Sequence, residues 1–213
     1  MSGTTFRHAA IAIVIVAFAP TAAAAQRRIG ISGYGIVGSV RLDADRTFDA
    51  VAGSSGALCV GGGVQLTRLW NELLVDVSFS QLTVNGERVA VGEDGVLQPL
   101  GIPLQVRMRP FDFAIGWRTQ YRRFSIFGGG GVSRLMYKET SDGAQAREDV
   151  TTSSTGPLIL AGIDVTTSRV LRIGGELRYR HIGGILGEGG ASAVFREKSA
   201  GGLSVGLRVS VGH

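Results

Sequence analysis

Three glycines near the start of the chain have the spacing of a dinucleotide-binding fingerprint. Gly33, Gly35 and Gly38 stand in the order G-x-G-x-x-G after an apolar run. The fingerprint requires a strand that ends and a helix that begins at the glycines, and an acidic residue about 20 positions later to bind the ribose. Here a polar, turn-rich segment follows, and the next apolar run contains no acidic residue. We therefore interpret these residues as glycines within a strand, where bulk is unwelcome.

The residue types that bind metals or form disulfides are scarce. Outside the N-terminal 25 residues only His181 and His213 carry imidazole groups, and Cys59 is the single cysteine. A zinc site and an internal disulfide are therefore not predicted. The D-x-D spacing at Asp43 and Asp45 lacks the rest of a calcium loop, so we interpret it as a solvated loop.

One residue, His181, is considered as a candidate for catalysis. A barrel enzyme that acts on lipids would need a serine beside a histidine that serves as general base. The neighbours two positions from His181 are Tyr179 and Gly183, so that arrangement is absent locally. The sequence therefore predicts no catalytic residue, no cofactor and no metal ligand.

The elements that carry these residues are strands. Side chains alternate with period two throughout, as in Leu73, Val75, Val77 and Phe79, and no segment after the first 25 residues keeps a helical period over three turns. We expect eight strands, near residues 28–40, 57–70, 72–83, 99–111, 120–137, 157–167, 170–185 and 201–211.

The connections alternate between long polar segments and short turns. The long segments lie near 41–56, 84–98, 138–156 and 186–200, and the short turns near 70–71, 110–117 and 168. This pattern is typical of outer-membrane barrels. Residues 1–25 carry a basic start, an apolar segment and an A-x-A motif, so a cleaved signal peptide and a barrel domain over residues 26–213 are predicted.

The expected fold class is all-β: an eight-stranded antiparallel up-and-down transmembrane barrel whose apolar face contacts lipid. The opposite face carries small residues, arginines and a few acids, which suits a narrow lumen that side chains fill. A soluble barrel with an apolar interior is the alternative. We expect a lumen network of Gln65, Asp76, Arg107, Arg109, Asp164, Arg172, Glu176, Arg178, Arg180 and Arg208. Aromatic residues are expected at the membrane interfaces, namely Trp70, Phe79, Phe111, Phe113, Trp117, Tyr121, Tyr137 and Tyr179.

Parity gives three expectations about pairing. A two-residue turn at residues 70–71 pairs Val64 with Val77 and places Gln65 opposite Asp76. A turn centred on residue 168 makes Asp164 and Arg172 a direct cross-strand ion pair. The apolar residues change parity across the glycines 128–131, which predicts a one-residue bulge there.

The stretches RRFSIFGGGGVSRLMYKE and GGELRYRHIGG, with the signal peptide and the eight alternating strands, resemble the small outer-membrane β-barrel proteins of Gram-negative bacteria, including OmpA-type and OmpW-type barrels. The resemblance implies an outer-membrane location, lipid contact, and periplasmic chaperones and the barrel-assembly machinery as partners during biogenesis. Such chains commonly end in an aromatic residue, whereas this one ends Val211-Gly212-His213.

The predicted role is structural, or the passage or surface binding of small molecules. Seven basic and twelve acidic residues lie in the long loops, and no basic aromatic platform is present, so nucleic-acid binding is not expected. A lipid-modifying barrel enzyme and a soluble periplasmic lipocalin-like binder are the alternatives.

Overall fold

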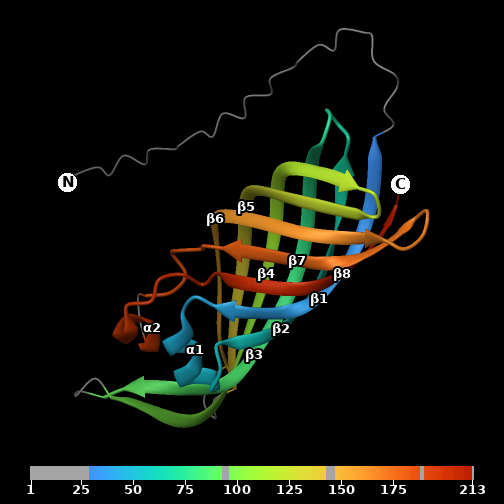
Figure 1. The fold of residues 1–213 in the computed structure, drawn as a ribbon. Helices are drawn as coiled ribbons and strands as arrows, with labels where there is room; N and C mark the ends of the chain where they lie inside the picture. Colours follow the sequence, from blue (N-terminus) through green and yellow to red (C-terminus); the bar gives the residue numbers. More distant parts are fainter. Residues whose placement is uncertain (1–28, 93–95, 143–146, 188–189, 213) are drawn as a thin grey trace, which may run out of the picture.

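The computed structural model describes residues 29–92, 96–142, 147–187 and 190–212, and the expected signal peptide lies outside them. Eight antiparallel strands form one closed barrel, in which each strand pairs with its sequence neighbours and the first pairs with the last (Figure 1). The predicted eight-stranded up-and-down architecture is confirmed. The strands are β1 (Gly30–Leu42), β2 (Gly56–Thr67), β3 (Leu73–Val91), β4 (Leu97–Tyr121), β5 (Phe124–Asp142), β6 (Arg147–Thr166), β7 (Leu171–Arg180) and β8 (Gly202–Gly212).

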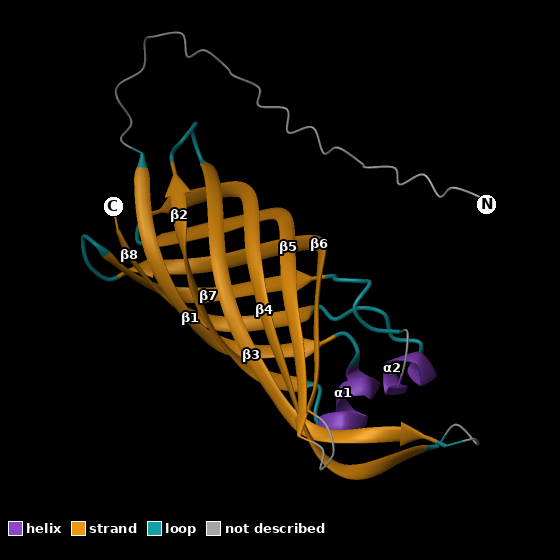
Figure 2. Ribbon diagram, turned by 180° about the vertical axis from the view of Figure 1, so that it is seen from behind, coloured by secondary structure: helices purple, strands orange, loops and turns teal. Residues whose placement is uncertain are grey.

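The two ends of the barrel differ. Short turns join β2 to β3, β4 to β5 and β6 to β7 at one end, here called the turn end. The opposite loop end carries α1 (Asp45–Ala52) and α2 (Gly190–Phe195), which lie beside each other beyond the barrel (Figure 2). Gly53 ends α1 with a φ of 69°, a left-handed conformation that glycine adopts without strain. No helix among the described residues is long and apolar enough to cross a membrane.

Four strands are longer than the sequence analysis predicted. The segment 110–117, interpreted as a turn, lies inside β4, and the chain reverses only between Tyr121 and Phe124. The β3–β4 pairing is interrupted between Phe79–Phe111 and Leu82–Met108, where the proline has no N–H to donate. Much of the predicted loops 84–98 and 138–156 is also strand, and these extensions project beyond the barrel at the loop end (Figure 1).

Along these long strands the two faces exchange polarity while the alternation keeps its phase. On β3 the outward side chains Val77 and Phe79 are followed by the polar Gln81. On β4 the outward Phe111 and Phe113 are apolar, whereas Arg109, one step nearer the loop end, is polar. Inward side chains change in the opposite sense. Each of these strands is therefore apolar outside and polar inside near the turn end, and polar outside and apolar inside near the loop end.

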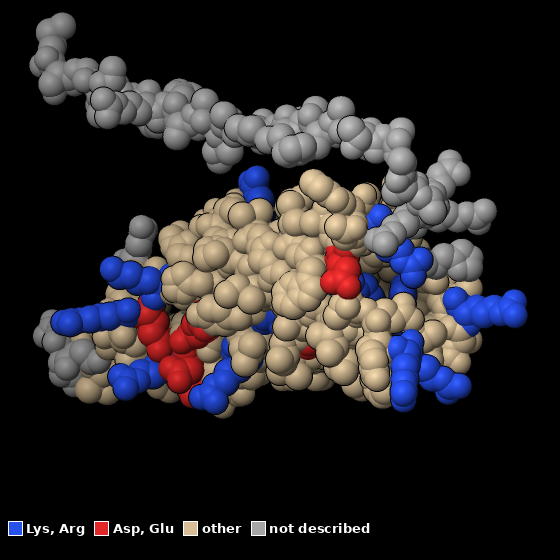
Figure 3. Space-filling view, turned by 45° about the horizontal axis from the view of Figure 1, so that its top comes forward, with Lys and Arg blue, Asp and Glu red and all other residues tan. Residues whose placement is uncertain are grey.

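The exchange occurs at the same level on neighbouring strands. We call this level the polar ring; it comprises Gln81, Arg109, Arg134 and Ser153. Arg109 Nε donates a hydrogen bond to Gln81 Oε1 at 2.9 Å, and an Arg134 amino group lies 3.4 Å from Ser153 Oγ. Between this ring and the turn end the outer surface is an apolar belt, and Figure 3 shows a broad uncharged zone with Lys and Arg gathered towards both ends.

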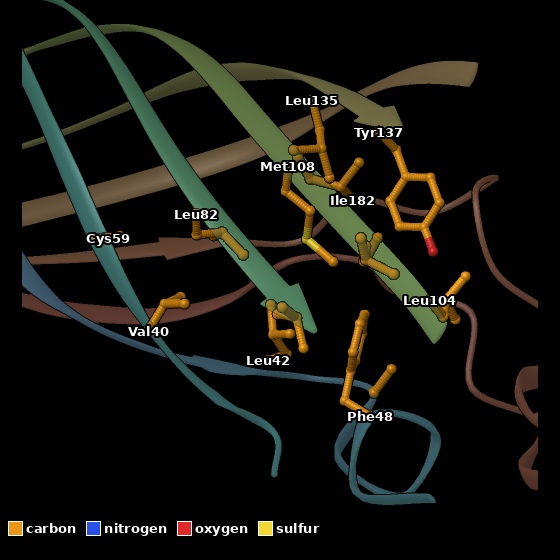
Figure 4. Packing of buried hydrophobic residues seen from close by; sticks show 14 residues of the cluster. Val40, Leu42, Phe48, Cys59, Leu82, Leu104, Met108, Leu135, Tyr137 and Ile182 are labelled. Carbon is orange, nitrogen blue, oxygen red and sulfur yellow. The ribbon is translucent and has the colours of Figure 1, made fainter. Parts of the chain in front are cut away.

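On the loop side of the ring the interior is an apolar core. Phe48 of α1 packs among Leu42, Leu104 and Tyr137, which come from different strands (Figure 4). Tyr137 and Leu135 are buried and point inward. The expected bulge at glycines 128–131 is wrong, because β4 and β5 pair without a register shift across them. The parity change that suggested it comes from the exchange of polarity between the faces.

Candidate functional site

The interior at the level of the apolar belt is filled by buried charges, with Arg178 at the centre. Its guanidinium donates to Asp112 Oδ2 at 2.9 Å, to Asp76 Oδ1 at 3.0 Å and to the Tyr34 hydroxyl at 2.6 Å. It also contacts Glu176 on its own strand. Because β1, β3, β4 and β7 all contribute to this one cluster, the guanidinium ties opposite walls of the barrel together.

Two further arginines complete the middle of the network. Arg180 holds Asp112 by two hydrogen bonds, from Nε at 3.1 Å and from an amino group at 2.6 Å, which is the bidentate geometry that makes such pairs strong. Arg208 donates to Glu176 Oε2 at 2.8 Å. The Arg208 guanidinium carbon also lies 3.6 Å from the centroid of the Tyr34 ring, a cation–π contact.

A fourth arginine extends the network towards the turn end. Arg118 donates to Asp164 Oδ2 at 2.5 Å and to Gln65 Oε1 at 3.0 Å. The Gln65 amide in turn donates to Asp76 Oδ2 at 2.9 Å, which links this pair to the rest. Four arginines thus face four carboxylates in ion pairs, and the network is electrically neutral. Charges removed from water persist only when they are paired in this way.

The structure places most of the predicted lumen residues inside the barrel. Gln65, Asp76, Asp164, Glu176, Arg178, Arg180 and Arg208 are buried there, and Arg172 is partly buried near the turn end. Arg107 and Arg109 are the exceptions, which corrects the prediction. Both lie on the outer face of β4, because this strand has crossed the polar ring and its apolar side chains Val106 and Met108 point inward.

The two predicted hairpin registers have opposite outcomes. β2 and β3 pair Val64 with Val77 and Gln65 with Asp76, as predicted. The Asp164–Arg172 cross-strand pair is wrong, since Asp164 lies opposite Gly174. The β6–β7 turn is longer than expected, because the Thr167 N–H bonds to the carbonyl of Leu171, and this shifts the register by two residues.

Among the network members that sequence reasoning missed are Tyr34, Asp112 and Arg118. Tyr34 stands inside the glycine motif, and its hydroxyl donates to Asp76. Asp112 lay inside the segment interpreted as a turn, and Arg118 lay directly after it. The period-two alternation continues without a break through Asp112 and Ala114, and this pattern could have shown that the segment is strand. All three motif glycines lie in β1, as expected, but a side chain is excluded only at Gly38, where a Cβ would lie 2.2 Å from the Val205 carbonyl oxygen; at Gly33 and Gly35 a Cβ would meet no atom within 4 Å, which corrects the prediction there.

The predicted interfacial aromatics are distributed unevenly. Trp70 and Tyr121 are exposed at the turn end, and Phe79 and Phe111 lie outward beside the polar ring. Outward positions also hold Phe113 and Trp117, which lie within the belt, and Tyr179 near the loop end. Tyr137 corrects the prediction, because it belongs to the inner apolar core.

A cavity of about 630 Å³ opens at the loop end, next to the apolar core. It lies between the two helical segments and the long β3–β4 and β5–β6 hairpins. Most of its wall is apolar, and a few polar side chains interrupt it. The lining comprises Thr47, Phe48, Val51, Arg88, Val89, Leu100, Leu104, Val106, Tyr137, Glu139, Val150, Thr152, Ile185, Leu186, Ala191 and Ser192.

The polar groups of this cavity are fixed by neighbours. The Tyr137 hydroxyl donates to Glu139 Oε2 at 3.1 Å. Burial, followed by the negative charge of Glu139, raises the pKa of Tyr137 above its ordinary value, so the phenol is neutral at physiological pH. Glu197 of the α2 loop accepts hydrogen bonds from the backbone and hydroxyl of Thr47, which ties α1 to the α2 segment.

The groups near His181 do not form a hydrolytic triad. His181 Nδ1 lies 3.8 Å from Asp43 Oδ2, and the Ser199 hydroxyl donates to this same carboxylate oxygen at 2.8 Å. A triad requires the histidine between the carboxylate and the serine, whereas here the carboxylate stands in the middle. Among the described residues no group of three His, Cys, Asp or Glu side chains could hold a metal ion.

No protein-family model and no curated protein matches this chain. Solved structures do match over most of its length. Neisserial surface protein A has a TM-score of 0.52 at 8% identity, covering 85% of this chain and 96% of its own. Ail, the attachment invasion locus protein of Yersinia pestis, in complex with the heparin analogue sucrose octasulfate, has 0.50 at 13%, with 86% and 97% covered.

A major outer membrane protein from Thermus thermophilus has a TM-score of 0.58 at 9% identity, covering 85% of this chain and 99% of its own. At these identities the likeness concerns the fold. Closed antiparallel topology, an apolar belt and a charged interior agree with it. The chain therefore has the fold of the eight-stranded outer-membrane β-barrel proteins.

Proposed function

We propose that this protein is an outer-membrane barrel that conducts nothing and that binds a small, largely apolar molecule at its external end. The observation that carries the proposal is the cavity of about 630 Å³ at the loop end, walled by two helices and two long hairpins. It stands on the far side of a lumen filled by ion pairs. In this proposal the barrel anchors the protein in the membrane, and the loop end binds the ligand.

The polarity of the surfaces supports the membrane location. Leu207, Val205 and Ile159 expose 74%, 54% and 63% of their surface on the belt, while charges fill the interior behind them. A soluble lipocalin-like barrel has the reverse arrangement, with the apolar face inside. The solved structures that share the fold are themselves described as surface or outer-membrane proteins in two of the three cases.

The filled lumen favours binding over passage of solutes. A permeating molecule would have to displace Arg178 from Asp76 and Asp112, and each broken buried pair costs about 3–5 kcal/mol. Planar-bilayer recordings test this point. We expect no single-channel steps from the purified protein, and a regular open conductance would overturn the closed-anchor part of the proposal.

The cavity has the features of a small-molecule site. Its volume lies within the range of about 300–1,000 Å³ typical of ligand pockets, and its wall is mainly apolar with a few polar groups. Glu139 and the neutral Tyr137 hydroxyl, which are hydrogen-bonded to each other, supply polar atoms on one wall. A compact apolar ligand with one hydroxyl or amine group matches this lining best.

A methyl NMR titration tests ligand binding. The barrel, labelled at Leu, Val and Ile methyl groups in lipid nanodiscs, is titrated with a panel of compact aromatic alcohols and amines. We expect saturable shifts at Leu104, Leu186 and Ile185 for at least one compound. The variant Val106→Trp fills the cavity and should abolish them.

A matched control adds the same bulk elsewhere. Leu207→Trp lies on the exposed belt and should leave the titration unchanged. Shifts that persist in Val106→Trp, or that are strongest at belt methyl groups, would show partitioning into lipid and would contradict the proposal. The enzyme alternative predicts phospholipid hydrolysis by the purified protein, which the position of Asp43 between Ser199 and His181 disfavours.

A further inference from the structure

The opposite end of the barrel contains a second cavity that the loop-end site does not use. It has a volume of about 170 Å³ and lies at the turn end. Arg68 of the β2–β3 turn, Arg169 of the β6–β7 turn and the inward-facing Arg172 of β7 line it, together with Ser168. Three arginines from two turns and one strand thus line one small cavity.

Among the described residues these three arginines form no ion pair, unlike the four arginines of the buried network. Four arginines and four carboxylates are paired within that network, so Arg172 is an additional positive charge at the edge of the network nearest the turn end. Asp164 attracts Arg172, but Arg118, Arg208 and Arg68 all repel it. Oδ2 of this carboxylate is engaged by Arg118 at 2.5 Å, and Oδ1 has no hydrogen-bond partner among the described residues. The charge balance at the turn end is therefore positive among the described side chains.

Two of the residues that line this cavity, Arg172 and Ser168, also carry hydrogen-bond donors that are not used. The Nε of Arg172 is buried and has no hydrogen-bond partner among the described residues. The Ser168 oxygen accepts from the backbone N–H groups of Val170 and Leu171, at 3.4 and 3.2 Å, so its own hydrogen is available to donate. A buried donor without a partner is costly, and an anion that accepts from it removes that cost.

We propose that this turn-end pocket binds a phosphate group. A phosphate presents enough oxygens to accept from several guanidinium groups at once, and arginine is well suited to it through bidentate hydrogen bonds. The volume of about 170 Å³ accommodates one such group with its water and excludes a large ligand. The inference is independent of the loop-end cavity.

Two sources of phosphate fit this chemistry. One is soluble phosphate, which would reach the mouth of the barrel from the aqueous side. The other is the headgroup of an anionic phospholipid, because Arg68 and Arg169 are exposed on turns at the edge of the apolar belt. The experiment below distinguishes them.

Calorimetric titration of the folded protein with inorganic phosphate, in a maltoside detergent at constant ionic strength, tests the site. We expect one saturable site, and at least tenfold weaker binding in Arg172→Gln and Arg68→Gln. Arg122→Gln is the matched control for Arg68→Gln, since both arginines lie exposed on turns of the turn end with positive φ (60° for Arg68, 54° for Arg122). The control should bind like the original protein.

A stability measurement separates binding from folding. Phosphate should raise the melting temperature of the original protein and leave that of Arg172→Gln unchanged. Without phosphate, Arg172→Gln should melt at the same temperature or higher, because the substitution removes a repelled charge. Absence of saturable binding to the original protein, or equal weakening in Arg122→Gln, would overturn the proposal.

Reconstituted vesicles identify the source. If phosphatidylglycerol in the vesicles abolishes the phosphate titration, the pocket holds the lipid headgroup. If the titration persists there with the same affinity, the pocket takes soluble phosphate. In vesicles without phosphatidylglycerol, Arg172→Gln should weaken the phosphate titration at least tenfold, as in detergent, and a titration that this substitution leaves unchanged counts against the site.

Discussion

Breaking the Arg118–Asp164 pair is the sharpest test of the buried network. Asp164 is fully buried, and the hydrogen bond from Arg118 at 2.5 Å is its direct ion pair. Two unit charges about 4 Å apart interact by about 4 kcal/mol at an effective dielectric constant near 20. Removing one partner of a buried pair costs about 3–5 kcal/mol, because the other charge stays desolvated. We expect Arg118→Met and Asp164→Asn each to lower the free energy of unfolding by about this amount.

A double-mutant cycle isolates the pairwise term. Equilibrium unfolding in urea from lipid vesicles gives the four free energies, and the double variant should recover about 2–3 kcal/mol of the summed losses. A control cycle uses Asp164→Asn with Arg172→Met, the pair that sequence parity suggested but whose residues are not opposite in the barrel. A coupling below about 0.5 kcal/mol for Arg118 with Asp164, or a larger coupling in the control cycle, would refute the assignment.

The surfaces and the strand contacts allow three more tests. Val77→Arg on the belt should lower the free energy of unfolding by about 2–4 kcal/mol in the same assay. Thr83→Arg, on the same face of β3 but beyond the polar ring, should lower it by less than about 1 kcal/mol. Equal losses would mean that the belt lies elsewhere. Gly38→Ala should destabilise the protein by about 1–3 kcal/mol, because its Cβ would meet the Val205 carbonyl. The control Gly33→Ala should be neutral, because no atom lies within 4 Å of a Cβ there. A neutral Gly38→Ala would contradict the close approach of β1 and β8. Arg178→Ala should produce small conductance steps in a planar bilayer where the original protein gives none, and an unchanged silent trace would mean that other groups close the lumen.

The sequence allowed the strand number, the closed topology and one hairpin register to be predicted. Period-two alternation survives in every strand, and the β2–β3 turn is short enough for parity to determine that Val64 pairs with Val77. The same reasoning failed between β6 and β7. Backbone bonding within the turn around Ser168 adds residues to it, and parity cannot detect a shift by two, since it leaves every side chain on the same face.

The errors at Arg107, Arg109 and Tyr137 share one physical cause. The sequence analysis assumed that the apolar face of a strand contacts lipid along its whole length. A strand that continues past the membrane meets water outside and must bury apolar side chains inside, so the same parity then has the opposite meaning. Pro110 lies close to this change in β4, which made a continuous strand resemble two strands joined by a turn.

The exchange of polarity at the ring gives one continuous sheet two different sources of cohesion. Beyond the ring, Phe48, Met108 and Leu135 are removed from water as in a soluble protein, so melting this part should raise the heat capacity. Between the ring and the turn end, in the proposed membrane location, unfolding would transfer apolar side chains out of lipid and charged side chains away from their ion-pair partners, with a different thermal signature. Warming and cooling therefore act unequally on the two halves of the same β-strands.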